Sequence, residues 1–198
     1  MHPKVFKVFD EICREHAVQG AVLEIGATPD ASTLLNLPAL AGATEKIGIN
    51  KAGSSEFSGF RILECNANEM ACFSNARFDV LLCNAVLEHD PFFWKTLSEI
   101  RRVVRSGGVV AIGAPGYMKL PFESKFRRLL SKMPRLPSNS DGWALQHSTL
   151  TLGVHNFPGD YYRFSEQAFR EVIFEGMHNV VIHTVLVPPR IIGVGIRS

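Results

Sequence analysis

Residues 24–30 place a carboxylate, a glycine and a proline in one short turn, and this combination could bind a small ligand. Gly26 allows either a tight turn or the close approach of a ligand to the backbone. If Thr28 caps a helix that begins at Pro29, the proline removes one N–H donor and Asp30 adds a negative charge beside it. A pyrophosphate needs free donors at a helix start, and the sequence contains neither GxGxxG nor GxxxxGKS/T. The turn therefore disfavours an NAD or ATP site.

A cofactor without a phosphate group fits this turn better. S-adenosylmethionine carries adenosine, a sulfonium and an amino-acid end, and the carboxylate of Glu24 can bind its ammonium group directly or through water. The alternative is that Glu24 only caps a strand or pairs with a lysine. The residue types leave both interpretations open.

The elements around this turn alternate between short apolar strands and amphipathic helices, which predicts a doubly wound, mostly parallel α/β sheet. Ligands bind at the carboxyl ends of such strands, where the turn at Gly26 lies. We expect Gly107 and Gly108 to end the third helix. No helix separates the last two strands, so they should form an antiparallel hairpin. The expected strands are 21–26, 46–50, 60–64, 78–84, 109–112, 180–187 and 191–196, and the expected helices are 3–16, 29–40, 91–105 and 165–174.

Three stretches of the predicted sheet resemble motifs of the class I S-adenosylmethionine-dependent methyltransferases, especially the methyltransferase type 11 group. Residues 22–26, Val-Leu-Glu-Ile-Gly, resemble the first motif of that family. Residues 78–89 read FDVLLCNAVLEH and are similar to FDxVxxxxxLEH, and residues 99–108 read EIRRVVRSGG and are similar to ExxRVLKPGG. The resemblance covers roughly residues 20–198, and its middle stretch is the most specific part.

The resemblance implies a Rossmann-like class I methyltransferase fold with S-adenosylmethionine bound across the carboxyl ends of the strands. The first motif would line the methionine end, and the residue that closes the second strand would meet the ribose. The pair after the third strand would meet the adenine, and the end of the fourth strand would face the cofactor. The residues implied to bind the cofactor are Glu24, Gly26, Ala27, Asn50, Asn66, Ala67, Asn84 and Ala85.

This chain departs from the family pattern at three places in the predicted cofactor site. The GxGxG motif is reduced to Gly26-Ala27-Thr28, and amides stand at Asn50 and Asn66 where the family usually has carboxylates. An amide still accepts one hydrogen bond and donates others, so we expect weaker binding rather than none. Two alternatives to a methyltransferase are a degenerate, non-catalytic S-adenosylmethionine-binding domain and, less favoured, a nicotinamide-dependent oxidoreductase.

Methyl transfer from a sulfonium is an in-line displacement that needs alignment of donor and acceptor and no nucleophilic side chain. An acceptor hydroxyl would also need a base, for which His89, His155 and Asp160 are the candidates. Tyr161 and Arg163 lie in a DYxRF stretch similar to that of some type 11 members, and we expect them to orient a small-molecule acceptor. The alternatives are that His89 is structural and that Asp160 pairs with Arg163 in a buried corner.

Residues 114–159 break the alternating pattern, and we expect them to form an insertion or lid within a single domain of residues 1–198. Within this insertion, residues 119–135 carry six basic residues against one acidic residue, with apolar residues on one helical face. Such a helix suits a lid, a contact with a membrane surface or another anionic partner, an oligomer contact, or simple packing on the domain.

The composition of the chain suits one globular domain, with 198 residues, 46% of them hydrophobic and 20% charged. A net charge of +2 gives no reason to expect nucleic-acid binding. No apolar run is long enough to span a membrane and the start carries no secretion signal, so we expect a cytoplasmic protein. The four cysteines lack the paired spacing of a zinc site, which predicts free, mostly buried thiols and no metal. The sequence defines neither the acceptor nor the oligomeric state.

Overall fold

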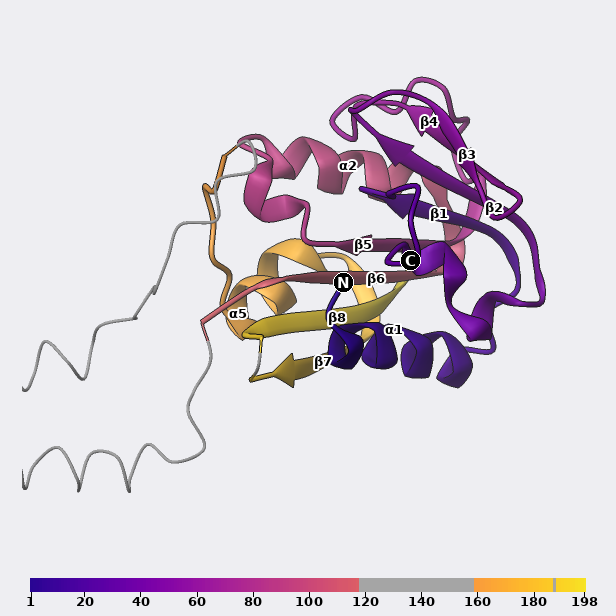
Figure 1. The fold of residues 1–198 in the computed structure, drawn as a ribbon. Coiled ribbons are helices and arrows are strands. Elements are labelled where there is room, and N and C mark those ends of the chain that lie inside the picture. Colours follow the sequence, from indigo (N-terminus) through magenta and orange to yellow (C-terminus); the bar gives the residue numbers. More distant parts are fainter. Residues whose placement is uncertain (118–158, 187) are drawn as a thin grey trace, which may run out of the picture.

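The computed structural model describes residues 1–117, 159–186 and 188–198 (Figure 1). One sheet of eight strands runs through them in the order β3-β4-β2-β1-β5-β6-β8-β7. Five neighbouring strands are parallel: β4 (Phe60–Glu64), β2 (Ala43–Asn50), β1 (Gly20–Ile25), β5 (Phe78–Asn84) and β6 (Val104–Pro115). Antiparallel pairs join β3 (Ser55–Phe57) to β4, β8 (Arg190–Arg197) to β6, and β7 (Met177–Val185) to β8.

The order in which successive strands are added to the sheet reverses direction between β1 and β5. From β1 the chain moves outward to β2 and β4, and it then returns to β5 on the other side of β1. Such a switch point leaves a crevice at the carboxyl ends of the two central strands, which is where α/β proteins bind ligands. The predicted fold class is confirmed: an α/β, mostly parallel sheet with an antiparallel C-terminal hairpin.

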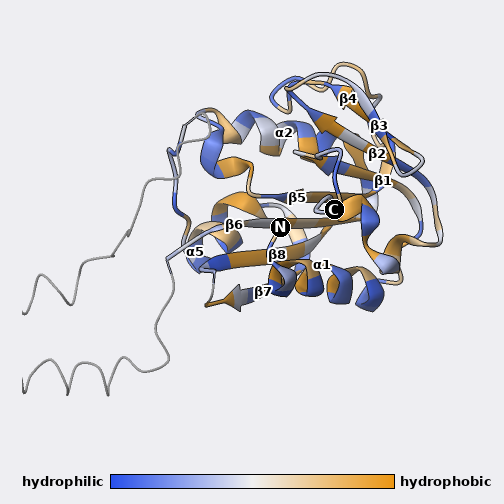
Figure 2. Cartoon of the chain, in the orientation of Figure 1, coloured by the Kyte–Doolittle hydropathy of each residue, from blue (hydrophilic) through white to orange (hydrophobic). Residues whose placement is uncertain are grey.

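Helices and short turns cover both faces of the sheet and bury two apolar cores (Figure 1). One face carries α1 (Pro3–Glu15) and the 3₁₀ turns η1 (Leu34–Asn36) and η2 (Pro38–Leu40). The other face carries α2 (Phe93–Val103), α5 (Glu166–Ala168) and the π-turn η4 (Phe169–Ile173). In Figure 2, β8 is mostly hydrophobic while α1 alternates between hydrophobic and hydrophilic residues, as a helix that buries one face should.

The helix predicted over residues 29–40 is wrong, because the structure has only the two three-residue turns η1 and η2 there. Thr33, rather than Thr28, caps the first turn, and its hydroxyl accepts a hydrogen bond from the backbone N–H of Leu35 at 3.4 Å. Pro38 then starts the second turn and lacks the N–H that a continuing helix would need. The proline and aspartate of the preceding turn consequently do not stand at a helix start. The loop offers no helix N-terminus for a pyrophosphate.

Two other predicted helices also differ from the structure. Helix α2 ends before residues 104–105, and Gly107 does not stop it. Gly107 instead lies inside β6 with a φ of 75°, close to where the register between β5 and β6 shifts. Its positive φ therefore serves a bulge in the strand rather than a helix cap. The helix predicted over 165–174 is a single α-helical turn followed by a π-turn.

The insertion or lid predicted at 114–159 lies largely outside the described residues. This holds for the basic stretch 119–135 and for His155, one of the three predicted catalytic residues. In the part of the chain that the structure describes, no helix is both long enough and apolar enough to cross a membrane.

Candidate functional site

The carboxyl ends of β1, β2 and β5 bring together most of the residues predicted to bind the cofactor. The backbone N–H groups of Gly26 and Ala27 both donate to the carbonyl of Ile49, at 2.9 and 3.1 Å. The N–H of Ala85 donates to the carbonyl of Gly113 at 2.9 Å. The turns after β1 and β5 are thus pinned to the strands beside them, and their positions relative to the sheet are fixed.

Asn50, which closes β2, uses both ends of its amide within the chain. Its Nδ2 donates to the carbonyl of Ala27 at 2.6 Å, and its Oδ1 accepts from the N–H of Ala52 at 3.1 Å. A carboxylate could not donate the first of these bonds. The structure therefore gives a local reason for an amide at the position where the family usually has an acidic residue: Asn50 joins the turns after β1 and β2.

The carboxylate of Glu24 lies inside the protein, with only 4% of the residue exposed. It accepts hydrogen bonds from the hydroxyl of Thr33 and from the N–H groups of Leu34 and Leu35, the latter two at 3.0 and 3.2 Å. Burial raises the pKa of Glu24 to about 7, against the lowering effect of these hydrogen bonds. The carboxylate predicted to meet an ammonium group is thus occupied by η1.

Gly26 is tightly constrained by its neighbour Val86. Its φ is 81°, a conformation that favours glycine, and an added Cβ would lie 2.4 Å from Cγ2 of Val86. Ala85 also has a positive φ, of 57°, directly before Val86. The glycine is therefore required by packing inside the chain, and a methyl group of Val86 already fills the space over it.

Two buried acceptors, one in the last residue of β5 and one in the turn after it, have no hydrogen-bond partner among the residues that the structure describes: Asn84 Oδ1 and Glu88 Oε2. The other carboxylate oxygen of Glu88 lies 3.6 Å from Nη1 of Arg190, which opens β8. Burial raises the pKa of Glu88, while the charges of Arg190, His89 and Arg163 oppose this rise. Buried acceptors without a partner are rare and costly in proteins, so they mark a place where a ligand can donate.

The segment 159–163 packs against the turn at 88–91, although the two lie far apart in the sequence. The Nδ1 atom of His89 contacts the carbonyl of Gly159. The N–H of Tyr161 donates to the carbonyl of Glu88 at 2.8 Å. The structure therefore brings His89 to the segment that holds Asp160 and Arg163.

Asp160 and Arg163 form the ion pair that the sequence left as an alternative. Nη2 of Arg163 donates to Oδ2 of Asp160 at 2.5 Å, and a second contact joins Nη1 and Oδ1. Their side chains are only 18% and 3% exposed, for Arg163 and Asp160 respectively. Tyr161, in contrast, is 57% exposed and free to meet a molecule from solution with its ring.

The loop after β4 holds the two residues predicted to meet the adenine, of which Asn66 is exposed and Ala67 is buried. Oδ1 of Asn66 accepts from the N–H of Asn68 at 3.1 Å. The amide of Asn68 in turn donates to Asp90 at 2.7 Å and to Thr96 at 2.8 Å. These bonds tie the loop to the start of α2.

Sequence reasoning missed several residues that shape this site, notably Val86, Asn68 and Arg190. Val86 is part of the family-like stretch at 78–89, so its place beside the first turn had a signal in the sequence. Arg190 had none, because it reaches Glu88 from the last strand, which is inserted beside β6.

Two pockets in the described part of the molecule lie away from these residues. One, of about 420 Å³, lies between α1 and the loop after β1 and is lined by residues that include Phe6, Asp10 and Ser32. The other, of about 340 Å³, is lined by residues 43–47 and 59–61 at the amino ends of β2 and β4. Within the described ranges, no cluster of three His, Cys, Asp or Glu side chains could hold a metal ion.

Comparison with known proteins shows which protein family and which solved structures this chain is similar to. Residues 35–112 match the family model described as a methyltransferase domain, of type 11. YcgJ from Bacillus subtilis is similar over 100% of this chain and 99% of its own length, with a TM-score of 0.60 and 12% identity. No curated protein sequence matches the chain.

Two further solved structures are named methyltransferases. The 1,6-didemethyltoxoflavin-N1-methyltransferase of Burkholderia thailandensis has a TM-score of 0.61 at 16% identity, covering 98% of this chain and 78% of that one. Phosphoethanolamine N-methyltransferase 2 of Haemonchus contortus has a TM-score of 0.58 at 12% identity, covering 96% and 52%. The chain thus shares the fold of these two methyltransferases. The match of residues 35–112 to the type 11 model agrees with the resemblance found in the sequence.

Proposed function

We propose that the chain binds S-adenosylmethionine at the switch point between β1 and β5 and transfers its methyl group to a small-molecule acceptor. The observation that carries this proposal is the pair of buried, unpartnered acceptors beside the switch point, Asn84 Oδ1 and Glu88 Oε2, counted over the described residues. The Burkholderia and Haemonchus enzymes were crystallised with S-adenosylhomocysteine and S-adenosylmethionine, respectively. A type 11 domain with the same fold supports the same cofactor here.

The chain fits the two halves of this cofactor unequally. On the adenosine side, Asn66 is exposed at the end of β4 and Asn50 stands at the end of β2 beside it. On the methionine side, Glu24 is occupied by η1, and a methyl group of Val86 fills the space over Gly26. We propose that Val86 turns away when the methionine half binds, and that backbone groups of the first turn take the place of the Glu24 carboxylate.

When bound, S-adenosylmethionine supplies an electrophilic methyl group, and this chain would supply position and proton transfer. In this proposal, Asp160 holds Arg163 through two contacts, and the guanidinium orients the acceptor. His89, beside the buried Glu88, takes the proton of an acceptor hydroxyl. His155 stays a further candidate for this role, and Tyr161 would line the acceptor's entrance.

A second candidate function is a cofactor-binding domain that has lost catalysis. The part of the site proposed to bind the methionine half favours this candidate. There, short 3₁₀ turns replace the expected helix, and their N–H groups donate to the carboxylate of Glu24. The two functions differ in the step after the cofactor binds. A methyltransferase turns over S-adenosylmethionine when the acceptor is present, whereas a degenerate domain binds the adenosine half and transfers nothing.

Calorimetric titration with S-adenosylmethionine and S-adenosylhomocysteine tests the proposal. We expect a dissociation constant on the order of 10 µM for the wild type. Asn84→Ala should weaken binding about tenfold, because it removes the buried acceptor at the switch point. Asn179→Ala, at an exposed position in β7 far from the switch point, is the control and should bind as the wild type does. Absence of heat at millimolar ligand (about 1 mM) would overturn the proposal.

A further inference from the structure

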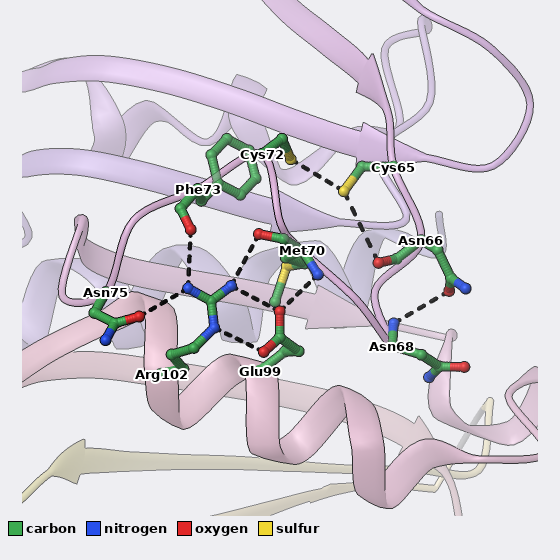
Figure 3. Close-up of polar contacts among 9 residues, drawn as sticks. All are labelled: Cys65, Asn66, Asn68, Met70, Cys72, Phe73, Asn75, Glu99 and Arg102. Atoms are coloured by element: carbon green, nitrogen blue, oxygen red, sulfur yellow. Dashed lines mark hydrogen bonds and ion pairs between the residues drawn. The ribbon is translucent and has the colours of Figure 1, made fainter.

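The four cysteines are free, but the expectation that they are mostly buried is wrong for two of them. Cys13 and Cys83 lie in the core, whereas Cys72 is exposed and Cys65 is partly exposed. The sulfur atoms of Cys65 and Cys72 lie 3.1 Å apart, as Figure 3 shows. A disulfide bond is about 2.05 Å long, so the two thiols are within about 1 Å of bonding distance.

The loop that carries Cys72 is held in place by an ion pair on α2, formed by Glu99 and Arg102 (Figure 3). Arg102 donates to the carbonyl groups of Met70 and Phe73, both at 2.9 Å. Glu99 accepts from the N–H of Met70 at 2.6 Å. The backbone on both sides of Cys72 is thus clamped to a helix.

Cys65 is held from the sheet, by fewer contacts. It directly follows β4, and its N–H donates to the carbonyl of Asn50 at 3.0 Å. Two independent anchors, the sheet for Cys65 and α2 for Cys72, therefore hold the two sulfur atoms together. Pre-organised thiols form a disulfide with little further loss of chain entropy.

We propose that Cys65 and Cys72 form a reversible disulfide by exchange with a low-molecular-weight disulfide. In the first step the Cys72 thiolate attacks one sulfur of that disulfide, forming a mixed disulfide and releasing one thiolate. Cys65 then loses its proton and attacks the Cys72 sulfur, which releases the second thiolate. The small disulfide is reduced to two thiols, and the two cysteines are oxidised to one disulfide.

The order of attack is set by the surroundings of the two thiols. Cys72 is exposed, while burial, together with the hydrogen bond and the charge of Cys72, raises the pKa of Cys65 to about 12. Those two contributions from Cys72 disappear once Cys72 is part of the mixed disulfide. The pKa of Cys65 therefore falls in the first step, although burial, the largest cause of its rise, remains.

Closure of the disulfide would act on the proposed cofactor site, a consequence that rests on the proposed function. Asn66 and Ala67, proposed to meet the adenine, directly follow Cys65. Because Glu99 and Arg102 hold the Cys72 loop, most of the approach must come from the Cys65 side. Oxidation would therefore shift the adenine-binding residues.

The test treats the intact, folded chain with oxidised glutathione and measures its mass and peptide maps. We expect the wild type to lose two hydrogens, to carry no glutathionyl group and to yield a peptide linked between Cys65 and Cys72, with full reversal by dithiothreitol. Cys65→Ser should stop at a glutathionyl group on Cys72. Cys13→Ser, which removes a buried thiol, is the matched control and should behave as the wild type does.

A second pair of variants tests the clamp. Arg102→Gln should slow ring closure about tenfold, so that the glutathionyl intermediate accumulates. Arg101→Gln removes the neighbouring arginine of α2, which binds the carbonyl groups of Val172 and Glu175 instead, and should close at the wild-type rate. The proposal is overturned if the folded wild type stops at a glutathionyl group on Cys72, or if both thiols stay free while the unfolded chain reacts. These readouts need no cofactor, so they stand apart from the proposed function.

Discussion

The turns after β1 and β5 lie side by side at the carboxyl edge of the sheet but use their polar groups in opposite ways. At the carboxyl end of β1, the carboxylate of Glu24 accepts three hydrogen bonds from the residues that follow the strand. Asn84, the last residue of β5, and Glu88, in the turn that follows, each keep a buried oxygen without a partner in the described ranges. Both turns resemble family motifs. In the first, the carboxylate is fully hydrogen-bonded within the chain, whereas in the second, buried acceptors remain without hydrogen bonds.

This difference teaches that the residue type in a motif does not decide whether its polar atoms are available. A buried carboxylate that already accepts three hydrogen bonds is a structural group, because breaking those bonds to bind a ligand leaves donors unsatisfied. A buried acceptor without a partner already carries the free-energy cost of an unsatisfied polar group. A ligand that donates a hydrogen bond to it removes that cost. The second turn is therefore the better-prepared half of the site.

The largest loss of stability should come from removing the carboxylate of Glu24 and the three hydrogen bonds that it accepts. Glu24→Ala leaves the N–H groups of Leu34 and Leu35 and the hydroxyl of Thr33 without their acceptor, so we expect the free energy of unfolding to fall by about 3 kcal/mol. Urea unfolding measures this change. Glu64→Ala, at an exposed position at the end of β4, is the matched control and should cost less than about 0.5 kcal/mol. A loss below about 1 kcal/mol in Glu24→Ala would show that the first turn does not depend on its carboxylate.

A smaller effect should come from the contact between the two turns. Gly26→Ala places a methyl group against Val86, whereas Gly59→Ala has nearly the same φ, 82° against 81°, with nothing within 4 Å. The first variant should therefore lose about 2 kcal/mol more unfolding free energy than the second. Adding Val86→Ala to Gly26→Ala should restore most of the difference. Equal losses in the two glycine variants would mean that backbone strain alone requires the glycine.

The smallest effect should be a pH dependence that separates two glutamates. Burial holds the folded-state pKa of Glu88 above its ordinary value of 4.5, so the folded state binds this proton more tightly than the unfolded state does. Its contribution to stability is full below about pH 4.5 and is lost as pH rises through the folded pKa. Glu88→Gln should therefore gain stability relative to the wild type as pH rises from about 5 to 8, which urea unfolding at each pH measures.

Glu99 provides the control of opposite sign. The hydrogen bonds from Arg102 lower the pKa of Glu99, so its contribution is present above the unfolded-state value and is lost as pH falls through the folded pKa. Glu99→Gln should accordingly be least costly at the acid end of the same urea titrations. Parallel curves for the two variants would contradict the conclusion that burial dominates the pKa of Glu88.

The sequence predicted the sheet well because alternating apolar strands and amphipathic helices are local patterns. It failed at residues 29–40, where apolar residues recur at intervals that suit a helix. The hydrogen bonds from Leu34 and Leu35 to Glu24, together with Pro38, favour two short turns instead. A side chain from a different element therefore overrode the local preference.

The sequence was sufficient to predict where the candidate site lies, but only part of the hydrogen bonds and ion pairs that its residues make. The residues that the family resemblance placed at the strand ends do lie at one edge of the sheet. His155, a predicted catalytic residue, lies outside the described residues. No local pattern could show that Asn50 donates to Ala27, or that Arg190 reaches Glu88 from the other end of the chain. Those facts depend on strand order and on contacts between distant segments.

Hydrogen exchange with and without S-adenosylhomocysteine tests the central claim most directly, because it reports each turn separately. If the ligand binds at the switch point, we expect strong new protection in peptides that cover residues 84–90 and 65–68. Peptides that cover 31–37 should change little, because their N–H groups already bond to Glu24 and to the turns η1 and η2. Protection confined to α1 and residues 31–38, where the 420 Å³ pocket lies, would contradict the account by placing the ligand elsewhere.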